Sequence, residues 1–212
     1  MKLRYFLLCL LIPFQNAYSA DFGPRSDTTF GLTATVAPLS FPFPFAYGAS
    51  AYFVASDNWL LEAEYLRSGM AIALFGFELG SVDERHISLQ ARYFPSDTGS
   101  FNFIMGGGNR NLSLKLARNL FDLATNSYSL TVSELSTNYI KLGLSNQWYW
   151  RNKYTVTFDW FSLNIPVNAE VKHSASRFAE NEDDQETIKD SETVLSWYPS
   201  GAILKASIGI TF

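Results

Sequence analysis

Six charged residues form the clearest chemical pattern in this 212-residue sequence. Three are acids and three are bases, and each lies in a stretch where apolar and polar residues alternate. If these stretches are strands, all six side chains point to the polar face. Balanced charges on one buried face predict a network that offsets the loss of water; the alternative is a polar path or gate. The six are Glu62, Glu64, Arg92, Lys141, Asp159 and Lys205.

A hydrolytic triad is the second chemistry that the sequence suggests. His86 and Ser88 share one polar face, and Asp159 is a candidate third member. No nucleophile-elbow sequence accompanies them, and the strand-like stretches contain many serines. We therefore expect an ordinary buried histidine and no catalytic residues.

The sequence predicts no metal and no cofactor. His86 and His173 lie far apart, and the sole cysteine, Cys9, lies in the N-terminal segment, so the clustered ligands of a transition-metal site are missing. Segment 180–192 is acidic, with Lys189 as its one base, but it lacks the spacing of a calcium loop. We expect a solvated loop there; the alternative is weak bridging by divalent cations at a lipopolysaccharide surface.

The elements that must position these residues are strands, because apolar and polar residues alternate with a period of two. Their lengths lie near the roughly 9–11 residues that a tilted membrane strand needs. This predicts an all-β fold, an eight-stranded antiparallel up-and-down transmembrane β-barrel. The expected strands are 30–37, 46–55, 59–67, 85–94, 100–107, 137–150, 154–163 and 202–212.

The connections between these strands alternate between short and long, which is the pattern of outer-membrane barrels. The long connections are 38–45, 68–84, 108–136 and 164–201. Two of them carry apolar residues, at 70–79 and 112–123. Either the strands extend above the membrane there or the segments fold back as a plug or short helix. The alternative is an apolar mouth for a small hydrophobic solute or a partner.

The N-terminal segment 1–19 has the layout of a secretory signal peptide. Lys2 and Arg4 precede an apolar run at 5–14. That run is about half the roughly 20 residues of a membrane-spanning helix. We predict a signal peptide at 1–19 and one barrel domain at 20–212.

The mature chain is acidic. Without Lys2 and Arg4 the 16 basic residues become 14, against 20 acidic residues, so the net charge is −6. This argues against nucleic acid as a partner.

Alternation alone does not separate a membrane barrel from a soluble lipocalin-like barrel with its faces exchanged. Here the polar face consists mostly of Gly, Ser, Thr and Ala, which suits the crowded interior of an eight-stranded barrel. Aromatic residues also gather where the strands meet the short turns, as in the girdle of a membrane barrel. The girdle candidates are Trp59, Tyr93, Phe94, Phe101, Trp148, Trp150 and Tyr154.

The last four residues, Gly209, Ile210, Thr211 and Phe212, end in an aromatic on the apolar face. They resemble the C-terminal assembly signal of outer-membrane barrels, with Gly209, Ile210 and Phe212 as its elements. The mature chain as a whole is similar in architecture to small eight-stranded outer-membrane proteins of the OmpA, OmpW and opacity-protein types. The resemblance implies a bacterial outer-membrane location, contact with outer-membrane lipid and lipopolysaccharide, and the barrel assembly machinery as a partner.

The predicted function is therefore that of a non-enzymatic integral outer-membrane β-barrel protein. Its surface-exposed loops would serve a structural or interaction role. The alternative is a narrow conduit for small hydrophobic solutes. A membrane-embedded lipid hydrolase or acyltransferase is the least favoured interpretation.

Overall fold

The computed structural model describes residues 28–74, 77–117, 129–151, 153–178 and 181–212. The expected signal peptide, residues 1–19, lies outside this part of the chain. The described elements are β1 (Phe30–Ala37), β2 (Leu39–Phe41), β3 (Ala46–Ser56), β4 (Trp59–Leu74), β5 (Phe77–Tyr93), β6 (Phe101–Ala117), β7 (Ser129–Trp150), β8 (Tyr154–His173), the 3-10 helix η3 (Ala175–Phe178), α2 (Glu182–Ser196) and β9 (Ser200–Thr211).

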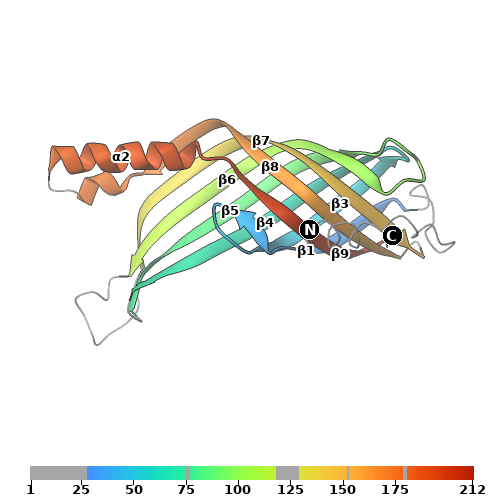
Figure 1. Cartoon of the computed structure of the whole chain (residues 1–212), viewed down its shortest axis with the longest axis horizontal. Coiled ribbons are helices and arrows are strands. Elements are labelled where there is room, and N and C mark those ends of the chain that lie inside the picture. The colour runs from blue at the N-terminus through green and yellow to red at the C-terminus, as the bar shows by residue number, and fades with distance from the viewer. Residues whose placement is uncertain (1–27, 75–76, 118–128, 152, 179–180) are drawn as a thin grey trace, which may run out of the picture.

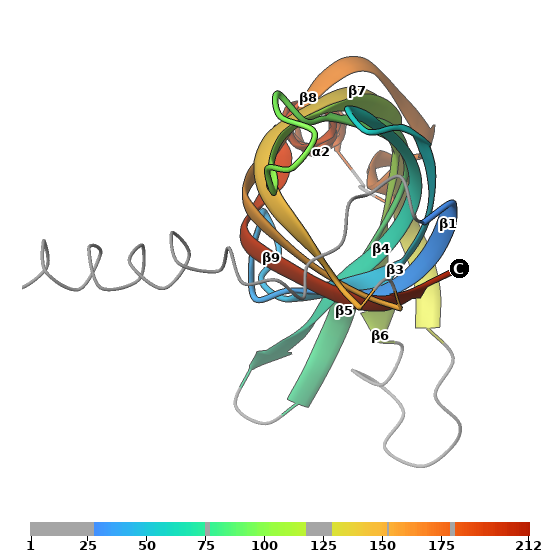
Figure 2. The same ribbon diagram turned by 90° about the vertical axis from the view of Figure 1, so that its right-hand side faces the viewer.

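Eight long strands form one closed antiparallel sheet. Each strand from β3 to β9 pairs with the next, and β1 pairs with both β3 and β9. The closing pair matches Gly31 with Thr211 and Val36 with Ala206, and Figure 2 shows the resulting ring end-on. The predicted eight-stranded up-and-down wall is confirmed. Strand β2 was not expected from the sequence. It pairs with residues 201–203 of β9, at the end of the barrel opposite the short turns.

Two hairpins and strand β8 are longer than the alternation predicts. Strands β4 and β5 extend to Leu74 and from Phe77, so most of the expected 68–84 connection is strand. Strands β6 and β7 extend likewise, and β8 continues to His173. The expectation that residues 68–84 and 108–136 form long connections is therefore corrected, because much of both segments is strand. The backbone hydrogen bonds between neighbouring strands continue beyond the membrane-spanning part of the wall, which is the part whose outer face must be apolar.

The expectation of a solvated loop at 180–192 is also corrected, because most of this acidic segment belongs to helix α2. Its first turn contains Glu182, Asp183 and Asp184, which interact favourably with the positive end of the helix dipole. Figure 1 places α2 at one end of the barrel, opposite the end that carries the C-terminus. No helix in the described ranges is long and apolar enough to span a membrane.

The two faces of the wall differ in chemistry. Leu89 and Ile208 point outward and are 70% and 65% exposed, whereas their neighbours Ser88 and Ser207 are buried in the interior. The same alternation holds around the ring, so large apolar side chains cover the outside and polar side chains fill the inside. This is the reverse of a water-soluble barrel.

Most girdle candidates lie where expected, on the outer face near the short turns. The rings of Trp59 and Tyr93 pack 4.9 Å apart, and those of Trp150 and Tyr154 lie 6.2 Å apart. Phe101 is exposed, and Trp148 is half-buried. Phe94 is a correction: it is fully buried, because it follows the outward-facing Tyr93 and so turns inward.

Candidate functional site

The six predicted charged residues meet in the barrel interior and form one continuous chain of ion pairs. Arg92 joins Glu62 and Asp159, with Nε 2.6 Å from Glu62 Oε2 and Nη1 2.9 Å from Asp159 Oδ1. Lys205 joins Asp159, at 2.7 Å, to Glu64. Lys141 ends the chain by donating to the other oxygen of Glu64. All six side chains are buried. The order of the chain is Glu62, Arg92, Asp159, Lys205, Glu64, Lys141.

Neutral polar groups complete this network. Gln90 Nε2 donates to Glu62 Oε2 at 2.7 Å, and Arg92 Nη1 donates to Ser145 Oγ at 2.9 Å. Buried charges need such partners, because the interior offers little water to solvate them. The network therefore fills the middle of the barrel with bonded side chains.

An irregularity in β8 and β9 lies directly beyond Asp159 and Lys205, on the side away from the short turns. The register between β7 and β8 shifts at this level, and Leu204 has a positive φ of 63°. As a result Phe161 and Ile203 face outward, although alternation continued from Asp159 and Lys205 would turn both inward. A non-glycine residue at positive φ is strained, so it persists where the surrounding structure holds it.

Apolar side chains close the interior below the network, toward the short turns. Tyr52, Val54, Leu60, Phe94 and Tyr149 form one buried cluster there. The rings of Tyr52 and Tyr149 meet edge to face, 6.4 Å apart. The interior at this level is a packed core, as expected for eight strands.

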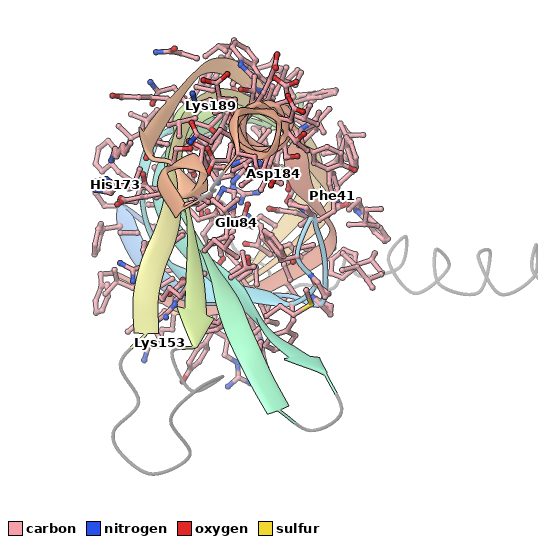
Figure 3. The ribbon with its side chains drawn as sticks, turned by 90° about the vertical axis from the view of Figure 1, so that its left-hand side faces the viewer. Phe41, Glu84, Lys153, His173, Asp184 and Lys189 are labelled. Atoms are coloured by element: carbon pink, nitrogen blue, oxygen red, sulfur yellow. The ribbon has the colours of Figure 1, made fainter. Side chains whose placement is uncertain are left out.

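The C-terminal end of α2 closes the opposite mouth. Arg110 donates to the carbonyl oxygens of Leu195, Ser196 and Tyr198 at 3.1, 2.9 and 2.9 Å. Thr137 Oγ1 adds a bond of 2.9 Å to the Ser196 oxygen. Carbonyls at a helix C-terminus lack partners within the helix and carry partial negative charge, so an arginine suits them. Figure 3 looks into this mouth, with α2 in front of the ring.

An apolar contact supports the same closure. Leu195 of α2 packs against the buried cluster of Val82, Leu112 and Leu135, which lies on the inner face of β5, β6 and β7. The described part of the apolar segment 112–123 therefore belongs to a strand and supplies a seat for the helix. This agrees with the alternative in which the strands extend.

A cavity of about 20 Å³ lies between the network and the mouth, lined by Glu64, Glu84, His86 and Lys141 among others. Glu84 Oε2 accepts from Ser68 Oγ at 2.9 Å and lies 3.3 Å from His86 Nε2. The volume is sufficient for about one water molecule. Sequence reasoning missed Glu84 and Arg110, because both lay in segments expected to be connections. The available signal was that Glu84 shares the face of His86, two residues away.

The structure does not assemble the Ser-His-Asp constellation. His86 faces Glu84, and its ring lies 5.8 Å from that of Tyr139. Asp159 is held by Arg92 and Lys205. The aspartate therefore has no role in orienting the histidine.

The proposed assembly-signal residues lie at the seam of the barrel. Ile210 and Phe212 point outward, and the Phe212 ring stacks on Phe30 at 6.3 Å. Gly209 lies opposite Thr33 in β1. Their recognition by an assembly machinery stays a prediction.

The closed wall, apolar outside and packed with polar groups inside, defines a small up-and-down β-barrel. Similar solved structures include the N-terminal β-barrel domain of Pseudomonas aeruginosa OprF, at 12% identity and a TM-score of 0.44, covering 87% of this chain and 98% of that one. A major outer membrane protein of Thermus thermophilus is 11% identical with a TM-score of 0.48, covering 87% and 99%. No family model and no curated protein matches the sequence. The fold assignment rests on the strand pairing itself.

Arg110→Ala is expected to loosen α2 while leaving the wall intact. The substitution removes three hydrogen bonds to the helix C-terminus, and bonds of a charged donor contribute about 1.5–3 kcal/mol each to stability. Trypsin cleavage after Lys189, within α2, should become faster, and this can be followed by mass spectrometry. Arg110→Lys is the matched control for charge, because an ammonium lacks the planar fork. Unchanged cleavage in both variants would show that Arg110 does not hold the helix.

Proposed function

We propose that this chain is an integral protein of a bacterial outer membrane and acts through the surfaces beyond the membrane. The observation that carries the proposal is the reversal of the two faces of the closed wall, with apolar side chains outside and a polar interior. An apolar surface of this extent, continuous around a barrel, is stable only in contact with lipid.

The filled interior supports a structural or interaction role in preference to transport. An apolar cluster, the ion-pair network and the end of α2 succeed one another along the barrel. Beyond the ring, the long hairpins and α2 form the surface available to partners (Figure 1). The end of α2 exposes Val194, Trp197 and Tyr198, which gives this surface an apolar component.

Cell fractionation tests the location. The full chain should be recovered with outer membranes, and its electrophoretic mobility in detergent should change on boiling, because a closed barrel resists unfolding until heated. A chain that is recovered from the soluble periplasm as a monomer of unchanged mobility would contradict the proposal.

A conductance measurement separates this function from the alternative of a conduit. The intact protein in planar bilayers should show no steady conductance, because the interior is filled at three levels. Replacing residues 182–196 with a short flexible linker should also leave the barrel closed, because the ion-pair network and the apolar cluster remain. Steady current from the intact protein would favour transport.

A further inference from the structure

Two arginines contact one acid on the outside of the barrel wall, and a lysine lies nearby on the neighbouring strand. Arg67 donates two hydrogen bonds to Asp83, from Nε to Oδ1 at 3.1 Å and from Nη2 to Oδ2 at 2.6 Å. Arg85 Nη2 lies 3.5 Å from the same carboxylate. Lys115 on β6 lies opposite Ser81, two residues from Asp83 on β5. We call Arg67, Arg85 and Lys115 the basic cluster.

The basic cluster carries excess positive charge on a protein that is acidic overall. Three bases against Asp83 leave a local charge of +2, and among the side chains that the structure describes Lys115 forms no ion pair. Arg67 and Arg85 remain about half exposed even though they contact the acid. Asp83 therefore fixes the position of Arg67 without neutralising the cluster.

The cluster lies at the height where the apolar outer face ends. Arg67 is eight residues beyond Trp59 on β4, and Arg85 is eight residues before Tyr93 on β5; both aromatics belong to the girdle. Eight residues along a strand tilted by about 40° rise roughly 20 Å. The apolar band of an outer-membrane barrel is about 25 Å tall. Arg67 and Arg85 thus face the headgroup region of the leaflet on the side of α2, and Lys115, opposite Ser81, lies farther from the apolar band.

A hollow of about 340 Å³ adjoins the cluster. Arg67 and Lys115 contribute its basic lining and Asp83 an acid. Met70, Ala71 and the ring of Tyr47 also line it. Two bases against one acid give this lining a net positive charge, which suits an anionic headgroup. A volume of this size is within the range of small-molecule sites.

We propose that the basic cluster and its hollow bind the phosphate of a phosphorylated glycolipid in the outer leaflet. The inference rests on the proposed outer-membrane location, and it identifies the residues that contact the lipid. Arginine forks match phosphate oxygens in two-bond geometry, and lysine adds a point charge. On the membrane side of the two arginines, the exposed side chains of Tyr65 and Ile87 then contact the first part of the acyl chains.

Native mass spectrometry of the refolded barrel in detergent tests this with three lipids: bisphosphorylated lipid A, dephosphorylated lipid A and phosphatidylglycerol. The protein should bind bisphosphorylated lipid A at least about tenfold more tightly than either other lipid, the effect of one charge-assisted hydrogen bond. The double substitution Arg85→Gln/Lys115→Gln should abolish this preference, while it leaves the Arg67–Asp83 ion pair in place. Arg151→Gln/Lys153→Gln, at the exposed turn on the other rim, is the matched control and should keep it.

Equal binding of the two forms of lipid A by the native protein would overturn the inference without the use of any variant. Equal binding of phosphatidylglycerol would also overturn it, because the site would then accept any anionic lipid. Each sample is first checked for the heat-dependent mobility of a folded barrel. A folded barrel that binds both forms of lipid A equally contradicts this inference alone. Absence of the protein from outer membranes contradicts the proposed function.

Discussion

Arg92→Ala is expected to lower the free energy of unfolding by about 3–5 kcal/mol, the typical effect of removing one partner from a buried ion pair. Arg92 contacts both Glu62 and Asp159, and its side chain is nearly inaccessible to solvent. Without it Glu62 loses its only cationic partner among the described residues, while Asp159 keeps Lys205. Urea unfolding of the refolded barrel, followed by tryptophan fluorescence, measures the change.

A double-mutant cycle shows whether the effect belongs to the pair. Glu62→Ala combined with Arg92→Ala should cost less than the sum of the single substitutions, because neither charge is then left alone. The matched control is Lys172→Ala, which removes the partner of Glu134 in a solvent-exposed pair 3.9 Å long. That change should cost at most about 1 kcal/mol. Equal small effects at both positions, with no coupling, would indicate a water-filled interior.

Ile208→Arg is expected to destabilise the barrel by about 2–4 kcal/mol, the cost of a lipid-facing arginine near the middle of the bilayer. Ile208 is 65% exposed on the outer face of β9, two residues from Ile210 and opposite Val156. It lies four residues from the Phe212 end of the wall, which corresponds to roughly 10 Å of height. Reversible unfolding in lipid vesicles gives the change in stability.

Met70→Arg is the control for depth. Met70 also exposes an apolar side chain, but it lies eleven residues beyond Trp59 and therefore above the apolar band. Near the interface the cost of arginine falls to about 0–1 kcal/mol. If both substitutions were equally tolerated, the outer face would not be in contact with lipid, and the membrane orientation would be wrong.

The central wall and the charged network could be predicted because the membrane imposes a strict period of two. Within the apolar band each inward position must be polar or small and each outward position apolar, so Glu62, Arg92 and Lys141 could be assigned to the interior. The equal numbers of acids and bases then indicated pairing. Which acid meets which base could not be predicted, because it depends on the stagger of the strands.

The mouth could not be predicted for the opposite reason. Beyond the band the outward face of a strand need not be apolar, so β4 to β8 continue without clear alternation, and Glu84 and Arg110 were left unassigned. Helix α2 is polar, so it has no strong apolar stripe to identify it; its place is fixed by distant groups such as Arg110 and Thr137. The register shift near Leu204 likewise depends on neighbouring strands.

Because of the ion-pair chain, the charge balance inside the barrel depends on whether every strand of the wall is in place. Its members come from β4, β5, β7, β8 and β9, and Lys205 is supplied by the last strand, which also forms the closing seam with β1. A wall without β9 holds Glu62, Glu64 and Asp159 against Arg92 and Lys141 alone, so its interior is one charge short of neutral. Docking of β9 brings the missing cation between Asp159 and Glu64. Charge balance inside is thus reached only when the last strand takes its place, so closing the ring and neutralising its interior are a single event.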